Sequence, residues 1–326
     1  LKLAKAYKAL GNNQQALLYY AKAYAARPSD FGLAYAYGAL LRQEGRNQKA
    51  DTVFVQLIDR QKSNASLYYQ LGMVRQAKED STATALFDKA LALNPQYTNA
   101  RYQLARNLLS KKQYETVDSL VAEGLLQTPD NLRLLSLLGL KQYLAKEYHP
   151  AIASIVKLDS LGSLNVQLRE YLANSYARTY QYEEALAQFK ILINQYDDQN
   201  ANWHYTLSKC YLGMNEIEKA RRHINIAIGL LDVPLDAHFV TLAITYNREG
   251  NYKLVIETLQ EALKENARNE TARFQLAVAA DNFYEDKAKV LPFYEAYANE
   301  FEKGRNIETV LYRISDLKKE LFMTKD

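Results

Sequence analysis

The sequence predicts an all-α protein, a solenoid of about nine helix-turn-helix units followed by one C-terminal capping helix. Three observations predict this fold. Large and small apolar residues recur with a period of about 34 residues along the chain. Only 12 Gly and 6 Pro occur in 326 residues, too few for the many special turns of a β-sandwich or barrel. From Ile307 to Leu321, apolar residues follow the spacing of three and four that an amphipathic helix requires.

The predicted second helix of each unit is marked by three apolar columns. A large residue stands at the centre, with a small residue four positions before it and a small or aliphatic residue three positions after it. The earlier column begins with Ala16, Ala50 and Ala83 and is broken by Lys289. The central column advances in steps of 33 to 35 residues through Tyr20, Phe54, Phe87, Val121, Ile155, Phe189, Ile224, Leu259 and Phe293. Columns that keep one phase over the chain indicate a structural repeat.

The predicted first helix of each unit carries a large residue followed directly by a small one. We expect the large residue to fill the space between the two helices of a unit. We expect the small residue to let a neighbouring helix backbone approach closely. The pairs are Leu3–Ala4, Tyr37–Gly38, Leu71–Gly72, Leu104–Ala105, Leu138–Gly139, Leu172–Ala173, Leu207–Ser208, Leu242–Ala243 and Leu276–Ala277.

Turn residues separate the predicted helices. Gly11, Gly45 and Gly250 stand where a first helix ends, and glycine readily adopts the left-handed conformation that ends a helix. Between units, Pro28 and Pro129 stand where one helix stops and the next is capped.

The segment from Tyr68 to Pro95, with Leu71–Gly72, Ala83–Phe87 and Ala90 between them, resembles the tetratricopeptide repeat family almost column by column. The resemblance covers residues 1 to about 300. It implies a right-handed superhelix in which the first helices line a concave groove and the second helices form the outer wall. Pentatricopeptide arrays, which bind RNA, have a similar period but lack these columns.

The repeat predicts a continuous array over residues 1–303 and a capping helix over residues 304–326. The predicted units lie near residues 1–30, 31–64, 65–97, 98–131, 132–165, 166–200, 201–235, 236–269 and 270–303.

Composition limits the classes of function. Lys and Arg number 41 against 37 Asp and Glu, and this net charge of +4 is too small to require nucleic acid or anionic lipid as a partner. Cys210 is the only cysteine, which excludes internal disulfides and CxxC-type sites. No stretch reaches the roughly 18 apolar residues of a transmembrane helix.

The first seven residues, Leu1 to Tyr7, lack an initiator Met and a signal-type apolar core. We therefore expect an upstream part, and the localisation stays unknown. The start and the resemblance to bacterial repeat proteins favour a bacterial periplasm or envelope over the cytoplasm.

Positions on the first helices that face the implied groove form the candidate binding site for a peptide. The candidates are Lys5, Tyr35, Tyr69, Met73, Asn99, Tyr102, Arg106, Asn174, Asn202, Tyr205 and Lys209. Tyr offers a large contact area at low conformational cost, and Asn pairs with peptide backbone. Arg106 and Lys209 are suited to acidic side chains or a C-terminal carboxylate.

Two interpretations of the tyrosines stay open. Tyr35, Tyr69 and Tyr102 stand in one column and would form a ladder along the groove, or they pack against the second helices. In the family's best-known peptide clamp, Lys and Asn recur at set groove positions. Lys5 fits that pattern, whereas Tyr35, Ala39 and Met73 do not, so the sequence disfavours a carboxylate clamp of that type.

The sequence contains no phosphate-binding loop, no serine-hydrolase elbow and no His-Glu-x-x-His motif. His204 and His238 are 34 residues apart, so successive units would bring them close, with Cys210 on the same helix as His204. A zinc site there would need a further ligand in register. We expect instead partly exposed histidines at helix starts and a small, buried Cys210.

The sequence therefore predicts a non-enzymatic scaffold that binds a peptide or protein segment in the concave groove, without a cofactor or metal. One alternative is a structural component of a bacterial envelope complex that packs through the array ends. A second alternative, a zinc-binding or enzymatic role, is supported only by His204, His238 and Cys210. The partner's identity and the oligomeric state are not encoded in these patterns.

Overall fold

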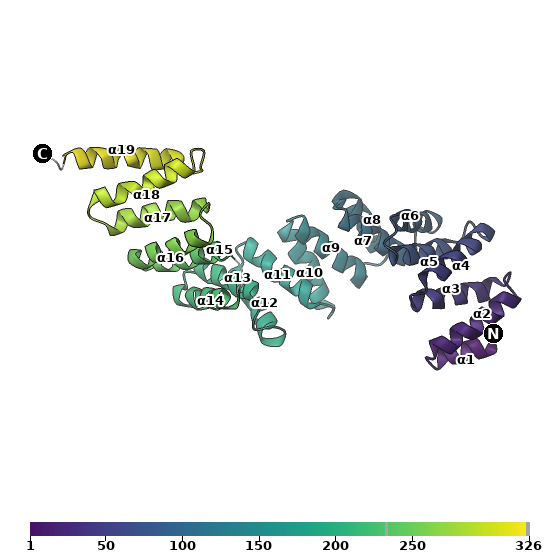
Figure 1. Cartoon of the computed structure of the whole chain (residues 1–326). Coiled ribbons are helices and arrows are strands. Elements are labelled where there is room, and N and C mark those ends of the chain that lie inside the picture. Colours follow the sequence, from purple (N-terminus) through teal and green to yellow (C-terminus); the bar gives the residue numbers. More distant parts are fainter. Residues whose placement is uncertain (232–233, 324–326) are drawn as a thin grey trace. The chain divides into compact units, whose positions relative to one another are not determined.

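The computed structural model describes residues 1–231 and 234–323 (Figure 1). Within these residues the chain forms nineteen helices and no strand. The chain divides into two compact units, Leu1–Ser163 and Leu164–Asp326. The prediction of an all-α protein built from helix pairs is confirmed. The boundary between an array and a cap at residue 303, and the boundaries of the single repeats, stay predictions.

The first compact unit contains five helix pairs. They are α1 (Lys2–Ala9) with α2 (Asn13–Ala26), α3 (Phe31–Gln43) with α4 (Asn47–Arg60), α5 (Ala65–Gln76) with α6 (Ala83–Leu93), α7 (Thr98–Ser110) with α8 (Tyr114–Gln127), and α9 (Leu132–Leu144) with α10 (Tyr148–Ser160). Within this unit, each second helix also packs on the first helix of the following pair.

The second compact unit contains four helix pairs and a final helix. They are α11 (Val166–Arg178) with α12 (Tyr182–Gln195), α13 (Ala201–Gly213) with α14 (Ile217–Leu230), α15 (Asp236–Arg248) with α16 (Tyr252–Glu265), α17 (Glu270–Phe283) with α18 (Lys287–Glu300), and α19 (Ile307–Met323). Most first helices begin at a side-chain cap whose oxygen accepts a backbone N–H, which stabilises the first turn. The caps are Asp30, Asn64, Asn131, Asn165, Asn200 and Asn269.

The apolar columns of the second helices form the core between the paired helices. Phe54, Phe87 and Phe189 are fully buried, and so are the alanines four positions before the first and last of them. In α18, however, the expected centre Phe293 is only partly buried, and Val290, Tyr294 and Tyr297 are buried instead. The prediction for this pair is wrong by one residue. The shifted face lets the Tyr294 hydroxyl reach Asp281 and the Tyr297 hydroxyl reach Glu270, both on α17.

The small residues of the first helices make room for side chains of their own partner helix. A Cβ added to Gly72 would lie 2.7 Å from the Phe87 ring, and one added to Gly139 would lie 2.7 Å from Ile155. Phe87 and Ile155 are the central residues of α6 and α10. The expectation that the small residue admits a neighbouring backbone is therefore wrong for these positions, where it admits the large side chain of the same pair.

Eight of the nine described pairs have a left-handed residue just after the first helix, and the pair of α17 and α18 does not. Gly11, Gly45 and Gly250 have φ values of 74°, 69° and 71° at this position. Other pairs place non-glycine residues there, with φ values from 56° to 63°. These residues are Glu79, Lys112, Lys146, Tyr180 and Asn215. A residue with a Cβ is strained in this conformation, although Asn tolerates it better than the others.

The final helix α19 packs on α18 and covers the apolar side of the last pair. Val310 and Leu317 are fully buried against Val290 and Tyr297. Arg313 of α19 donates to both carboxylate oxygens of Asp281 on α17, at 2.6 and 2.9 Å. With Lys287 also donating to Asp281, the pKa of this carboxyl falls to about 2. None of the described helices is both long and apolar enough to cross a bilayer.

Candidate protein-binding face

The predicted binding residues all lie on first helices, and we call the side that the first helices form within a compact unit the first-helix face of that unit. Seven of them belong to the first compact unit: Lys5, Tyr35, Tyr69, Met73, Asn99, Tyr102 and Arg106. Four belong to the second: Asn174, Asn202, Tyr205 and Lys209. The polar residues Lys5, Asn99, Arg106, Asn202 and Lys209 are exposed, and the others are half-buried.

The tyrosines of the first unit connect each pair to the next one. The Tyr35 hydroxyl on α3 lies 2.7 Å from the Ser66 hydroxyl on α5 and accepts a hydrogen bond from Gln70 at 3.1 Å. The Tyr69 ring contacts Tyr97, which immediately precedes α7, at a centroid distance of 5.1 Å. These contacts give Tyr35 and Tyr69 a packing role between neighbouring pairs.

The third tyrosine of the ladder has an ionic neighbour. The guanidinium carbon of Arg133 on α9 lies 5.9 Å from the Tyr102 ring centroid, and Arg133 donates to the Asn99 side chain at 3.3 Å. Asn99 and Tyr102 are thus brought together, but both are already engaged by the next first helix. Arg106, one turn further along α7, has no ion pair among the described residues and stays exposed.

In the second unit, Tyr205 occupies the same position and contacts the next pair. Its ring centroid lies 4.3 Å from that of His238 on α15, and the Lys209 ammonium lies 5.1 Å from it on the same helix. A cation at this distance from an aromatic face is attracted to the ring. Lys209 is therefore oriented along the first-helix face with its charge exposed.

A pocket of about 300 Å³ opens on this face between α11 and α13. It brings together two of the predicted residues, Asn174 and Lys209, with Arg178, Thr206 and the start of α12. Asn202 is not among its lining residues, although it lies on α13. In the described part of the chain, neither Arg178 nor Lys209 has a carboxylate partner, and no lining residue is acidic. The pocket therefore presents two unneutralised cations and an amide to a ligand.

Tyr180 and Tyr182 also line this pocket, and neither was predicted from the sequence. Tyr180 has a φ of 63° at the turn position that holds glycine in some pairs and other residues in the rest, and its side chain is 77% exposed. Its ring meets that of Tyr182 edge to face at 6.1 Å. The signal for Tyr180 was its place in the column of Gly11, Gly45 and Gly250.

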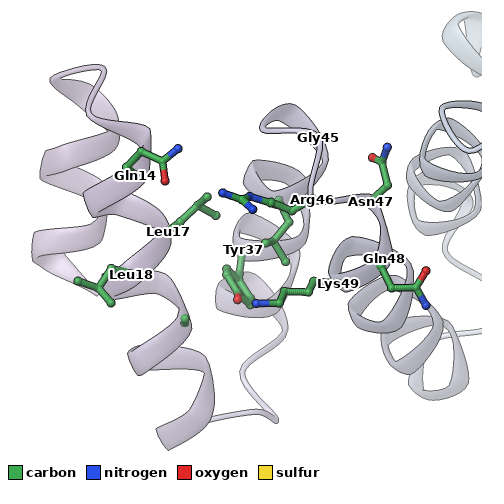
Figure 2. A pocket seen from close by; sticks show the side chains of 11 residues that line it. Gln14, Leu17, Leu18, Tyr37, Gly45, Arg46, Asn47, Gln48 and Lys49 are labelled. Carbon is green, nitrogen blue, oxygen red and sulfur yellow. The ribbon is translucent and has the colours of Figure 1, made fainter.

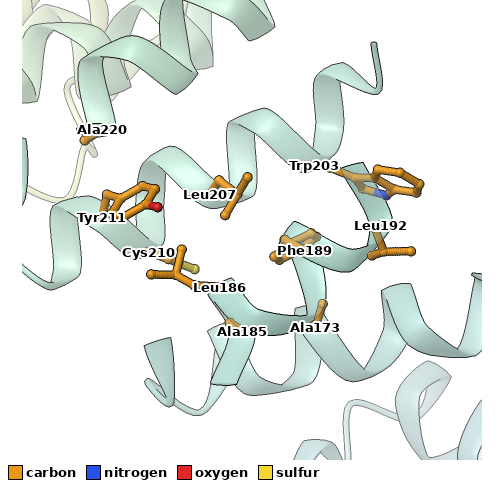
Figure 3. Packing of buried hydrophobic residues seen from close by; sticks show 10 residues of the cluster. All are labelled: Ala173, Ala185, Leu186, Phe189, Leu192, Trp203, Leu207, Cys210, Tyr211 and Ala220. Atoms are coloured by element: carbon orange, nitrogen blue, oxygen red, sulfur yellow. The ribbon is translucent and has the colours of Figure 1, made fainter. Parts of the chain in front are cut away.

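Cys210 forms the floor of the pocket and is 1% exposed. It packs in a cluster with Leu186, Leu207 and Tyr211 (Figure 3). Burial raises the pKa of the thiol to about 12, although Lys209 lowers it slightly. The expectation of a small, buried cysteine is confirmed, and at neutral pH the group is a thiol without thiolate reactivity.

The histidines are arranged differently from the prediction. His204 pairs with His223 across one helix pair, with 2.8 Å between the two Nδ1 atoms, while the His238 ring contacts the Tyr205 ring at an interplanar angle of 39°. His204 is 5% exposed, so the expectation of a partly exposed residue is wrong. Its Nε2 lies 3.0 Å from the Asp198 carbonyl, and an N–H there makes Nδ1 the acceptor for His223. Among the described residues, no three His, Cys, Asp or Glu side chains converge as metal ligands.

Comparison with known proteins identifies the repeat. A model of the tetratricopeptide repeat family matches residues 74–140, and a second model of the same repeat matches residues 1–30. The chain is a tetratricopeptide repeat protein. Its fold is that of a protein-interaction scaffold, and repeats of this family are generally non-catalytic. No curated protein matches the chain.

Several solved structures are similar to the chain at low sequence identity. A tetratricopeptide repeat protein from Parabacteroides merdae ATCC 43184 is 16% identical, with a TM-score of 0.51 over 75% of this chain and 96% of that one. Yeast Tom70 is 15% identical, with a TM-score of 0.45 over 99% and 88% of the two chains. The APC/C hetero-tetramer Cut9–Hcn1 is 13% identical, with a TM-score of 0.44 over 93% of this chain. The chain spans about half (52%) of the matched chain in that complex.

Proposed function

We propose that this tetratricopeptide repeat protein binds an acidic, extended segment of a partner protein on the first-helix face. The observation that carries the proposal is the pocket in which Asn174, Arg178 and Lys209 meet without any acidic neighbour among the lining residues. A carboxylate of the segment pairs with the two cations, while the Asn174 amide binds peptide backbone.

A tyrosine beside the two cations supports a peptide ligand. The exposed Tyr180 side chain lines the pocket and offers a ring and a hydroxyl group, and such a side chain gives a large contact area with few rotatable bonds. The first helices of the first unit carry half-buried tyrosine rings of their own, those of Tyr35, Tyr69 and Tyr102.

Peptide titration tests the proposal. The probe is a fluorescein-labelled synthetic peptide of about ten residues in which Glu and Ser alternate, and a peptide with Gln in place of Glu is its neutral counterpart. We expect added protein to raise the fluorescence anisotropy of the acidic peptide and to leave that of the neutral peptide unchanged. The double variant R178Q/K209Q should weaken its binding roughly tenfold or more, because two charge-assisted contacts are lost.

A matched variant separates the pocket from general charge. Lys190 and Arg268 are exposed in the same compact unit and lie outside the pocket. K190Q/R268Q removes the same two charges and should leave the affinity unchanged. Equal affinities of R178Q/K209Q and the wild type for the acidic peptide would show that the pocket is not the binding site.

A further inference from the structure

A second crevice lies between the second helices α2 and α4 of the first compact unit (Figure 2). Its volume is about 600 Å³, which is large enough for several side chains of a ligand. Residues from α2, α3 and the start of α4 line it. It shares no residue with the pocket of Arg178 and Lys209, which belongs to the other compact unit.

One wall of the crevice is apolar. Leu17, Leu18 and Ala21 of α2 line this wall, and Leu18 is 47% exposed. Tyr37 and Leu41 of α3 lie between the two helices and continue the apolar surface inward. A leucine that remains half in water beside such a surface gains free energy when a ligand side chain covers it.

The opposite wall is cationic. Arg46 and Lys49 are exposed, and in Figure 2 both side chains extend from the start of α4 towards α2. Neither has an ion-pair partner in the described part of the chain, and none of the lining residues is acidic. Glu44, two residues before Arg46, accepts a hydrogen bond from Asn13 at 2.8 Å and forms no ion pair with Arg46 or Lys49 among the described residues. The two charges therefore remain available to a ligand.

We propose that this crevice is a second docking site, which takes an acidic amphipathic helix from a partner protein. Leucine-like side chains of that helix pack on Leu17 and Leu18, and its carboxylates pair with Arg46 and Lys49. The charge complementarity selects an acidic partner, and the apolar wall selects one with a hydrophobic stripe beside its acidic residues. The site lies on the second helices, so one scaffold engages two different segments.

The test uses three synthetic helical peptides of about 15 residues that differ only in composition. The first carries a leucine stripe flanked by Glu, the second has Lys in place of Glu, and the third has Ser in place of Leu. We expect only the first to shift the Leu17 and Leu18 methyl signals in NMR spectra. R46Q/K49Q should weaken its binding roughly tenfold or more. L18S should also weaken it, because the apolar wall is interrupted.

Control variants make the result specific to the crevice. Lys62 and Lys89 are exposed in the same compact unit but outside the crevice, so K62Q/K89Q should bind like the wild type. R178Q/K209Q should also bind the helical peptide normally, which separates this site from the proposed groove function.

Three results would overturn the proposal. Unchanged affinity in R46Q/K49Q would exclude the cationic wall, and equal binding of the Lys peptide would exclude the charge selection. Sedimentation equilibrium that shows a dimer of the wild type, lost in R46Q/K49Q, would make a second copy of this chain the occupant instead.

Discussion

The hydroxyl groups of Tyr35 and Ser66 lie 2.7 Å apart and join the first helices of two successive pairs. Gln70 donates to the same tyrosine oxygen and accepts from the Arg42 Nε at 2.9 Å, so the four side chains form one network between α3 and α5. Tyr35 thus has a defined structural role, in addition to any role in ligand binding.

Replacing Tyr35 by Phe should therefore lower stability. The variant keeps the ring packing against Phe54 but removes the oxygen that both Ser66 and Gln70 use. We expect the free energy of unfolding to fall by about 1 kcal/mol, measured by urea denaturation followed by circular dichroism. Tyr68→Phe is the control, because the Tyr68 hydroxyl makes an exposed bond to the Lys62 carbonyl within the same turn region. If both variants unfold at the wild-type midpoint, the network does not stabilise the contact between pairs.

Replacing Gly72 by alanine should lower the stability of the protein. The added methyl group of G72A would lie 2.7 Å from the Phe87 ring, so the helices α5 and α6 must separate or the ring must move. We expect a loss of about 1–3 kcal/mol in the same denaturation experiment. Gly229 in α14 has no atom within 4 Å of an added Cβ, so G229A should be neutral or slightly stabilising.

A second variant tests the cause of that loss. Phe87→Leu vacates the space that the Gly72→Ala methyl group needs, so G72A/F87L should lose less than the sum of the single variants. Additive losses would mean that the ring and the methyl group do not compete for the same space.

The helix pairs could be predicted from the sequence because burial imposes one phase on every pair. A residue such as Phe54 or Ile155 must face its partner helix, so its column repeats whenever the pair repeats. The register of α18 could not be predicted, because Tyr294 and Tyr297 are buried there through hydrogen bonds to another helix, and hydroxyl partners leave no periodic signal.

The buried charged side chains could not be predicted from the sequence either. Arg101 is 2% exposed and donates to the carbonyls of Pro95 and Leu120 as well as to Glu123. Gly124 makes room for it, since an added Cβ would lie 2.7 Å from the Arg101 Cδ. Gly124, a glycine in a column that otherwise holds Ala and Leu, was the only sequence feature that indicated this buried side chain. The His204–His223 pair escaped prediction for a related reason, because a repeat period identifies equivalent positions and not partners within one pair.

Lys112 offers a gain in stability. It ends α7 with a φ of 58°, whereas Gly11 and Gly45 occupy the equivalent position of other pairs. We expect K112G to raise the free energy of unfolding by about 0.5–1 kcal/mol, because the relief of left-handed strain exceeds the entropy cost of glycine. The neighbouring Lys111 has a φ of −89°, so K111G should be destabilising by about 0.5 kcal/mol. Urea midpoints that move in the same direction for both variants would contradict this explanation.

His223 should make the stability of the second unit depend on pH. Burial, helped by His204 and Arg222, lowers the pKa of its imidazole from 6.5 to about 4. The folded state therefore resists protonation that the unfolded state accepts. The resulting stabilisation is complete above pH 6.5 and is lost as the pH falls towards 4. Because His223 is half-buried, we expect solvent screening to reduce the loss between pH 7 and pH 5 to about 1 kcal/mol.

His223→Gln isolates this contribution, because the amide keeps a donor for His204 Nδ1 but does not titrate. The pKa of His238 is also lowered, by burial against the opposing effect of Asp236, and its contribution is common to both proteins. The pH dependence of the urea midpoint should therefore be weaker in H223Q than in the wild type, and unchanged in H149Q, where an exposed histidine is replaced. If the urea midpoints of the wild type and H223Q change equally with pH, the His223 imidazole binds a proton as readily in the folded state as in the unfolded chain.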